Sequence, residues 1–216
     1  NYLVYRPGDA DRCFALPFFL PHLSVLDEAE IRAKFDLPET VLLFVGADGK
    51  RKGIETLCEA LDCAADTLHR LQVGAVFVSR DKPTCQRFQT VRHHEKLPRS
   101  TIQRLMRAAH LYCMVPRRES YGLVFVEAMA AGCAVVADDD LPRQEILDGG
   151  RCGRLLCSGD SRALADTLVE LVEDRGAALA LALKARTRAA GRFAPSVVGA
   201  AFLQEMAGMA PAGALV

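Results

Sequence analysis

The chain has 216 residues, 50% hydrophobic and 25% charged, which suits one or at most two domains that bury a core. Its 27 Lys and Arg residues balance its 27 Asp and Glu residues, and this balance argues against a nucleic-acid-binding protein or a general membrane-surface protein. No apolar run approaches the ~18 residues of a membrane span. No charged-then-apolar leader is visible, and the abrupt start at Asn1 is compatible with a fragment.

Residues 1–40 differ in pattern from the rest. The run YLVY at 2–5 is compatible with a strand, and DEAEIRAKF at 27–35 with a short helix. Between them, ALPFFLPHL at 15–23 is apolar and broken by prolines, which favours a loop packed on a sheet edge. The alternative is a surface that meets a partner domain or a membrane. We expect residues 1–40 to be a lead-in or interdomain linker.

Strands and helices are predicted to alternate from residue 41 onward. Apolar runs of strand length lie at 41–46, 73–79, 90–94, 111–115, 133–138 and 153–156. Helix-period spacing separates them, as at 54–61 and 102–109, and Gly132 is placed to end a helix that begins near Gly122. Only helices follow the sixth strand, near 160–174, 176–191 and 195–207. The pattern predicts an α/β domain over 41–207, with a doubly wound parallel sheet of about six strands, and a frayed tail at 208–216.

Eight cysteines occur, but none forms a C-x-x-C pair and no His-x-x-x-His motif accompanies them. Several lie inside apolar runs. We interpret them as reduced thiols in a cytoplasmic protein.

The first candidate binding segment is FVGADGKRKGIETL. A predicted strand ends at Gly46, the basic residues Lys50, Arg51 and Lys52 follow, and a helix begins near Gly53. Cations beside free helix N–H groups suit an anion such as a diphosphate. The glycine spacing matches neither the dinucleotide fingerprint nor the Walker A loop. A solvated basic turn is the equally weighted alternative.

The second candidate segment is PRRESYGLVFVEAMAAG at 116–132. Glu119 lies in a turn after a strand, and Glu127 lies in the helix that begins near Gly122. At ~1.5 Å per residue, Glu127 is about 8 Å along the axis, roughly the distance from a phosphate at the helix start to the ribose of the same nucleotide. Two carboxylates on either side of a phosphate site suit two sets of sugar hydroxyls. The alternative is a helix-start charge and a surface glutamate.

The motif E-x7-E followed by A-M-A-x-G-x-x-V-V-A resembles the retaining glycosyltransferases of the GT-B fold, glycosyltransferase family 4. The likeness extends to F-V-G-x5-K-G at 44–53 and E-I-L-D-G-G-x-x-G at 145–153, in the family order. RKG at 51–53 and SRDKP at 79–83 look closest to the subgroup that adds glucose to lipopolysaccharide core heptose. The resemblance implies that the chain is the C-terminal, Rossmann-like half of a GT-B fold.

The resemblance also implies roles for individual residues. Lys52 would bind the donor diphosphate, Glu119 would hold hydroxyls of the donor sugar, and Glu127 would hold the ribose hydroxyls. The remaining donor contacts would come from Gly46, from the backbone N–H groups of Tyr121, Gly122, Leu123 and Val124, and from the segment His94 to Leu97 against the base.

Two positions depart from the family pattern. The usual arginine five residues before Lys52 is Ala47 here, so Arg51 or Lys50 is expected to supply the second cation. The family's Gly-Gly before Glu145 is Leu141-Pro142, which predicts a stiffer loop or one shaped for another donor. The residues expected to take part in catalysis are Glu119, Lys52 and Arg51.

Further expectations follow from the resemblance. The co-substrate would be a nucleotide sugar, with a UDP-sugar favoured, and basic residues would replace a metal ion. Asp138–Asp140 is interpreted as an acidic turn at a strand end rather than a metal site, while His93 and His94 are either packing residues or part of the base pocket. The full enzyme would be cytoplasmic, compatible with peripheral contact at the inner face of the membrane.

In a GT-B enzyme the acceptor contacts lie on a first domain. The resemblance implies that this chain is the second domain alone, so the glycan or lipid-linked acceptor would require the N-terminal domain. The last helix, ending near 203–206, would cross back to it. Two alternatives remain open: a GT-B sugar-nucleotide epimerase and a non-catalytic GT-B scaffold.

Overall fold

The computed structural model describes residues 2–3, 15–16, 28–116 and 119–209. Within these ranges, no helix combines the length and the apolar character that crossing a membrane requires. Part of the YLVY run, most of 15–23 and residues 210–216 of the predicted tail lie outside the described residues.

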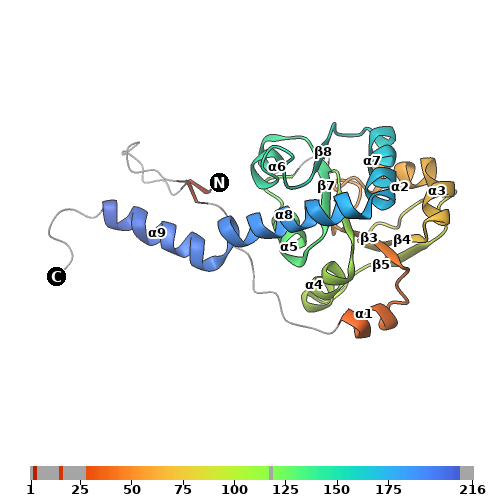
Figure 1. Cartoon of the computed structure of the whole chain (residues 1–216), viewed down its shortest axis with the longest axis horizontal. Coiled ribbons are helices and arrows are strands. Elements are labelled where there is room, and N and C mark those ends of the chain that lie inside the picture. Colours follow the sequence, from red (N-terminus) through yellow and green to blue (C-terminus); the bar gives the residue numbers. More distant parts are fainter. Residues whose placement is uncertain (1, 4–14, 17–27, 117–118, 210–216) are drawn as a thin grey trace.

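Six parallel strands form one sheet in the order β5-β4-β3-β6-β7-β8 (Figure 1). They are β3 (Thr40–Val45), β4 (Val73–Val78), β5 (Val91–His94), β6 (Leu111–Met114), β7 (Ala134–Asp138) and β8 (Arg154–Leu156). Within this sheet, the chain enters at the central strand β3 and runs outward through β4 to β5. It then returns to β6 beside β3 and runs outward through β7 to β8. The predicted doubly wound parallel sheet is therefore confirmed, and each predicted apolar run overlaps one strand.

The central strands are apolar along their whole length because helices cover both faces. Val41, Leu42, Leu43 and Phe44 of β3 are all 0% exposed. Such continuous apolar strands are typical of parallel sheets buried on both sides.

Helices divide into two layers. The packing pairs place α2 (Ile54–Cys63), α3 (Ala65–Arg70) and α7 (Ser161–Glu173) on one face of the sheet. The opposite face carries α1 (Glu28–Lys34), α4 (Arg99–Ala108), α5 (Leu123–Ala131) and α8 (Arg175–Phe193). The predicted helices at 54–61, 102–109, 122–132, 160–174 and 176–191 are thus present.

The short helix α6 (Leu141–Ile146) follows β7. The last helix, α9 (Pro195–Met209), leaves the body of the domain after α8 (Figure 1). It contacts the two-stranded antiparallel pair of β1 (Tyr2–Leu3) and β2 (Ala15–Leu16). The predicted helix at 195–207 is confirmed, and β1 confirms part of the YLVY strand.

Candidate functional site

The strand order reverses between β3 and β6, at the centre of the sheet. In open α/β sheets, ligands bind beyond the carboxyl ends of the strands at such a reversal, because the connections on either side diverge and leave a crevice. The segments that follow these two strands are the ones that carry the predicted site residues, the basic loop at 46–53 after β3 and the turn at 119–122 after β6.

The basic loop packs tightly against the end of β6. Gly53, which precedes α2, has a left-handed φ of 85°, and a Cβ there would lie 2.1 Å from the carbonyl oxygen of Val115. Only glycine fits this backbone conformation and this approach. The Asp81 carboxylate anchors the other end of the loop, since its Oδ2 accepts a hydrogen bond of 2.7 Å from the Gly49 N–H.

Lys52 and Glu119 meet in this crevice. The Lys52 ammonium forms a direct ion pair with Glu119 Oε2, and Arg51 Nη1 lies 3.9 Å from the same oxygen. The side chains of Lys52 and Glu119 are 14% and 11% exposed, and that of Arg51 is 48% exposed. The Lys52 stem runs over Gly46, where a Cβ would lie 2.8 Å from Lys52 Cγ. Arg51 therefore accompanies Lys52, whereas Lys50 is exposed to solvent.

Burial lowers the pKa of Lys52 to about 8, and the positive charges of Arg51 and Arg143 act in the same direction. The Glu119 carboxylate in direct contact opposes them. The ammonium is therefore held among two arginines, Arg51 and Arg143, and two carboxylates, Glu119 and Asp48. An incoming anion would offset the repulsion from the two arginines.

The second glycine-led helix start supplies backbone donors. Gly122 precedes α5 with a left-handed φ of 85°, and a Cβ there would lie 2.7 Å from Phe125 Cδ2. Leu123 and Val124 are the first residues of α5, and N–H groups of a first helical turn have no intrahelical acceptor. Tyr121 is 6% exposed, and its burial raises the pKa of its hydroxyl to about 12, so it stays neutral.

Glu127 lies further along α5, with its side chain 14% exposed. Its Oε1 accepts a hydrogen bond of 2.6 Å from Arg99 Nη2, at the first residue of α4. The segment between β5 and α4 therefore reaches the α5 side of the crevice. Leu97 belongs to this segment and His94 is the last residue of β5 before it. Burial lowers the pKa of His94, whose ring packs edge-on against Phe35 at 5.0 Å.

His93 has a structural contact instead, because its Nε2 lies 2.7 Å from the Ser79 carbonyl oxygen.

Arg143 is the residue near the site that the sequence interpretation missed. It belongs to α6 and is 0% exposed. Its Nη2 binds Asp138 Oδ2 at 3.2 Å and also pairs with Asp140, while Nη1 donates to the Glu119 carbonyl oxygen at 3.4 Å. The spacing of Asp140 and Arg143, three residues apart at a helix start, was the available signal.

The three aspartates form the acidic turn that the sequence predicted. Asp138 ends β7, Asp139 accepts a hydrogen bond of 2.8 Å from Gln144, and Asp140 caps α6 by accepting from the Arg143 N–H at 3.0 Å. Burial raises the pKa of Asp138, and the Arg143 charge opposes that shift. No group of three or more metal-ligating side chains gathers within the described ranges.

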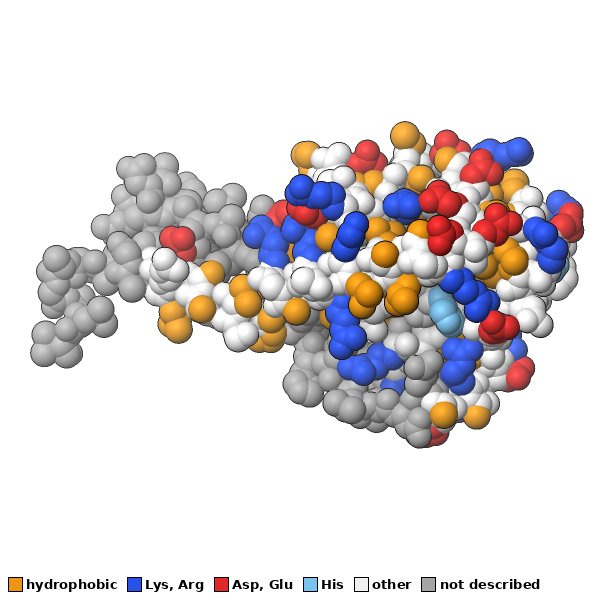
Figure 2. Space-filling view, in the orientation of Figure 1, with side chains coloured by type: hydrophobic (Ala, Val, Ile, Leu, Met, Phe, Trp, Pro, Cys, Tyr) orange, Lys and Arg blue, Asp and Glu red, His pale blue; other side chains and the backbone are white. Residues whose placement is uncertain are grey.

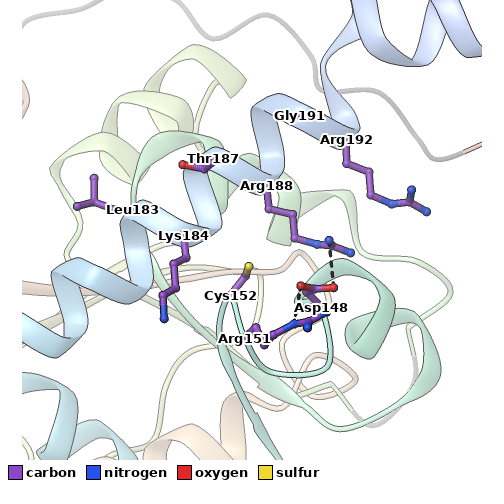
Figure 3. Close-up of a pocket in the computed structure, with 9 residues that line it drawn as sticks. All are labelled: Asp148, Arg151, Cys152, Leu183, Lys184, Thr187, Arg188, Gly191 and Arg192. Atoms are coloured by element: carbon purple, nitrogen blue, oxygen red, sulfur yellow. Dashed lines mark hydrogen bonds and ion pairs between the residues drawn. The ribbon is translucent and has the colours of Figure 1, made fainter.

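A separate cavity of about 690 Å³ lies between α8 and the loop after α6 (Figure 3). Its charged lining is Asp148, Arg151, Lys184, Arg188 and Arg192. Asp148 pairs with Arg151 at 2.8 Å and with Arg188 at 3.2 Å, as the dashed lines show. Arg192 pairs with Glu145 at 3.2 Å. None of the predicted site residues lines this cavity, and two carboxylates, Asp148 and Glu145, pair with three of its four cations.

The cysteines of the described residues are free thiols, Cys58, Cys63, Cys85, Cys113, Cys133, Cys152 and Cys157. Cys13 lies outside the described residues.

Comparison with known proteins assigns the family. The model for glycosyl transferases group 1 matches residues 39–174. A phosphatidyl-myo-inositol mannosyltransferase of Mycobacterium leprae is 36% identical over 146 residues, covering 64% of this chain and 38% of the relative. A D-inositol 3-phosphate glycosyltransferase of Catenulispora acidiphila is 29% identical over 206 residues, covering 87% of this chain and 45% of the relative. The chain thus spans less than half the length of these relatives.

Solved structures give the same fold. WaaG, a glycosyltransferase involved in lipopolysaccharide biosynthesis, superposes with a TM-score of 0.74 at 23% identity, over 86% of this chain and 54% of WaaG. Anabaena HepE in complex with UDP-glucose gives 0.71 at 22% identity, over 84% and 52%. The C-terminal domain of the Francisella tularensis protein LpcC gives 0.68 at 19% identity, over 82% and 96%. The chain belongs to the group 1 glycosyltransferase family and has the Rossmann-like architecture of a GT-B fold.

Proposed function

We propose that this chain binds a nucleoside diphosphate sugar, with UDP-sugars favoured, and is the donor-binding half of a retaining hexosyltransferase. The observation that carries the proposal is the Lys52–Glu119 pair at the reversal point of the sheet, between two glycine-led helix starts. In this reading, Lys52 and Arg51 receive the diphosphate, and Glu119 holds hydroxyls of the donor sugar.

The electrostatics of the crevice suit a leaving diphosphate. Lys52, Arg51 and the amides at the starts of α2 and α5 concentrate positive potential where negative charge grows as the glycosidic bond breaks. Such groups replace the metal ion that other transferases use on the diphosphate. We therefore expect binding to need no divalent cation.

We assign the nucleoside to the side of the crevice that α4 and α5 form. Glu127 already accepts a hydrogen bond from Arg99, and a ribose with two vicinal hydroxyls would share or replace that donor. The base would then lie on the segment from His94 to Leu97. HepE, whose complex with UDP-glucose has a similar fold, supports a uridine nucleotide as the first choice.

The acceptor is assigned to a further domain. The chain spans 38% of the phosphatidyl-myo-inositol mannosyltransferase of M. leprae, and that relative acts on a lipid-linked acceptor by its name. We propose a glycan or lipid-linked acceptor bound by an N-terminal GT-B domain. In the cytoplasm, that domain would bring the enzyme to the inner face of the membrane.

The test is calorimetry of the chain with UDP, UDP-glucose, GDP-mannose and ADP-glucose, each with EDTA and again with magnesium. We expect weak binding of at least one nucleotide sugar in EDTA, and its loss in Lys52→Met. The exposed Lys50→Met is the matched control and should bind as the unchanged chain does. Binding that appears only with magnesium, or equal losses in both variants, would refute the assignment.

A further inference from the structure

Arg143 is a buried arginine in contact with Glu119, the partner of Lys52. The Arg143 side chain is 0% exposed, although a guanidinium carries a permanent charge and is almost never fully buried without partners. Its partners are the Asp138 and Asp140 carboxylates and the Glu119 carbonyl oxygen. The guanidinium carbon Cζ lies over the Phe125 ring, 5.8 Å from its centroid.

These partners come from the three segments that shape the crevice. Glu119 belongs to the turn after β6, Phe125 to α5, and Asp138 to the end of β7. One rigid, forked side chain therefore ties the Glu119 turn to both neighbouring elements. A lysine could not do the same, because its single ammonium lacks the planar set of donors.

Arg143 is not arranged for the greatest stability. Its Nε is buried without a hydrogen-bond partner among the described residues, and Asp138 Oδ1 is in the same condition. Orphaned buried polar atoms cost free energy. A well-packed apolar side chain could replace such a buried charge cluster at little or no cost to the fold. The cluster thus calls for a reason other than stability.

We propose that Arg143 is a positioning residue of the candidate site: it fixes the Glu119 turn so that the carboxylate faces Lys52, and it sets the charge surrounding of Lys52. The consequence is that Arg143 governs the preference for a nucleotide sugar over the bare nucleotide. This consequence rests on the proposed function. Arg143 itself touches no substrate, since it is fully buried.

The effect of the Arg143 charge can be measured separately, through the pKa of Lys52. The charged groups around Lys52 are Asp48 and Arg51 on its own loop, Glu119 after β6, and Arg143 on α6. Arg143 and Arg51 lower the pKa of Lys52, while Asp48 raises it. Removing the Arg143 charge should therefore raise the pKa of Lys52 above its value of about 8.

The test compares three variants of the whole chain. Arg143→Gln with Asp138→Asn removes the two buried charges together, and the remaining partner carboxylate, Asp140, is 35% exposed and can be solvated. Asp138→Asn alone is the matched control, and Arg143→Lys keeps the charge without the forked donor set. Thermal unfolding and circular dichroism establish that each variant is folded.

Two measurements are made on each variant. The first is the ratio of UDP-glucose to UDP affinity, by calorimetry. The second is the titration of the Lys52 amine after reductive methylation with carbon-13, with the Lys52 signal assigned by its absence from Lys52→Arg. This second measurement needs no ligand, so it tests Arg143 even if no nucleotide binds and the proposed function fails.

We expect the double variant to lose the preference for UDP-glucose by about tenfold, as for one misdirected charged hydrogen bond, and to titrate Lys52 at higher pH. Asp138→Asn alone should keep the preference. Arg143→Lys should lose the preference while Lys52 titrates near its original pH. If the double variant is folded and leaves both the affinity ratio and the Lys52 titration unchanged, Arg143 is only structural and the proposal is overturned.

Discussion

Glu119 and Glu127 each face a cation, but the cations belong to different elements. Glu119 pairs with Lys52 on the loop after β3, and Glu127 with Arg99 at the start of α4. Both carboxylates are largely buried at the crevice wall, and the proposed function has each exchange a protein partner for a ligand hydroxyl. The two exchanges should affect different parts of a nucleotide sugar.

Substitution should separate the two roles. Glu127→Ala is expected to weaken UDP and UDP-glucose alike, by about 1–3 kcal/mol, because two ribose hydroxyls lose a charged partner. Glu119→Ala should weaken UDP-glucose more than UDP, since it removes contacts to the sugar. Calorimetry of both ligands measures this, with Glu59→Ala on the exposed side of α2 as the control. Equal losses of both ligands in both variants would contradict the assignment.

Lys52 gives the site a pH dependence with a definite sign. Because its pKa is lowered to about 8, the ammonium is charged below that pH and neutral above it. Affinity for UDP-glucose should therefore fall as pH rises through 8, with the midpoint higher in the complex because bound phosphates favour the charged form. In Lys52→Arg the guanidinium stays charged, so the fall should vanish between pH 7 and 9.5. An identical fall in Lys52→Arg would show that another group titrates.

At the residue scale, the sequence indicated which residues lie together at the crevice but missed the arginine beside them. Lys52, Arg51 and Glu119 were recognisable because motifs fix their places after strands, and the sheet topology then brings them together. Arg143 was not recognisable, because one arginine after three aspartates reads as a solvated helix start. Its burial depends on contacts with Asp138, Phe125 and the Glu119 carbonyl oxygen, which come from separate elements and which no local pattern encodes.

At the scale of elements, glycines set where α2 and α5 begin and where α5 ends. Gly53, Gly122 and Gly132 have φ values of 85°, 85° and 97°. The sequence predicted these boundaries because glycine is favoured where the chain must turn left-handed. It did not predict the short helices α3 and α6, since six residues are too few to show a helical period.

The glycine before α2 has a steric role that the glycine after α5 lacks. A Cβ at Gly53 would meet the Val115 carbonyl oxygen at 2.1 Å, whereas a Cβ at Gly132 would meet nothing within 4 Å. Gly132→Ala should cost only the left-handed strain, about 1–2 kcal/mol. Gly53→Ala should cost that strain and also displace the basic loop from β6. Chemical denaturation compares the two variants, and equal losses would mean that the loop does not pack on β6 as described.

At the scale of the molecule, α9 exposes large apolar side chains. Hydrophobic side chains lie along α9 where it leaves the domain (Figure 2), and Phe202, Leu203 and Met206 are 39%, 67% and 47% exposed. The chain covers about half of WaaG and of HepE but nearly all of an isolated C-terminal domain. The packing of the last helix on a first GT-B domain stays a prediction, and the exposed apolar side chains of α9 are the feature that motivates it.

The chain alone should therefore transfer no sugar. Its crevice lies at the ends of β3 and β6, and the proposed function gives the described residues there contacts to the donor and the leaving group alone. Transfer also needs an acceptor hydroxyl aligned at the anomeric carbon in a water-poor cleft, and such positioning can be worth ~7–11 kcal/mol. An open site forgoes most of that contribution, so slow donor hydrolysis is the most we expect.

The measurement is an assay of the purified chain with the donor it binds best and a panel of acceptors that includes lipopolysaccharide core sugars and phosphatidylinositol. The same chain joined to the N-terminal half of its own enzyme is the positive control, and it should transfer the sugar with retention of the α-configuration. Because that fusion presents the same Lys52, Arg51 and Glu119, any difference between the two belongs to the added domain. Turnover by the chain alone on the order of 1 s⁻¹, as in a complete enzyme, would place the acceptor site within these 216 residues and overturn the two-domain interpretation.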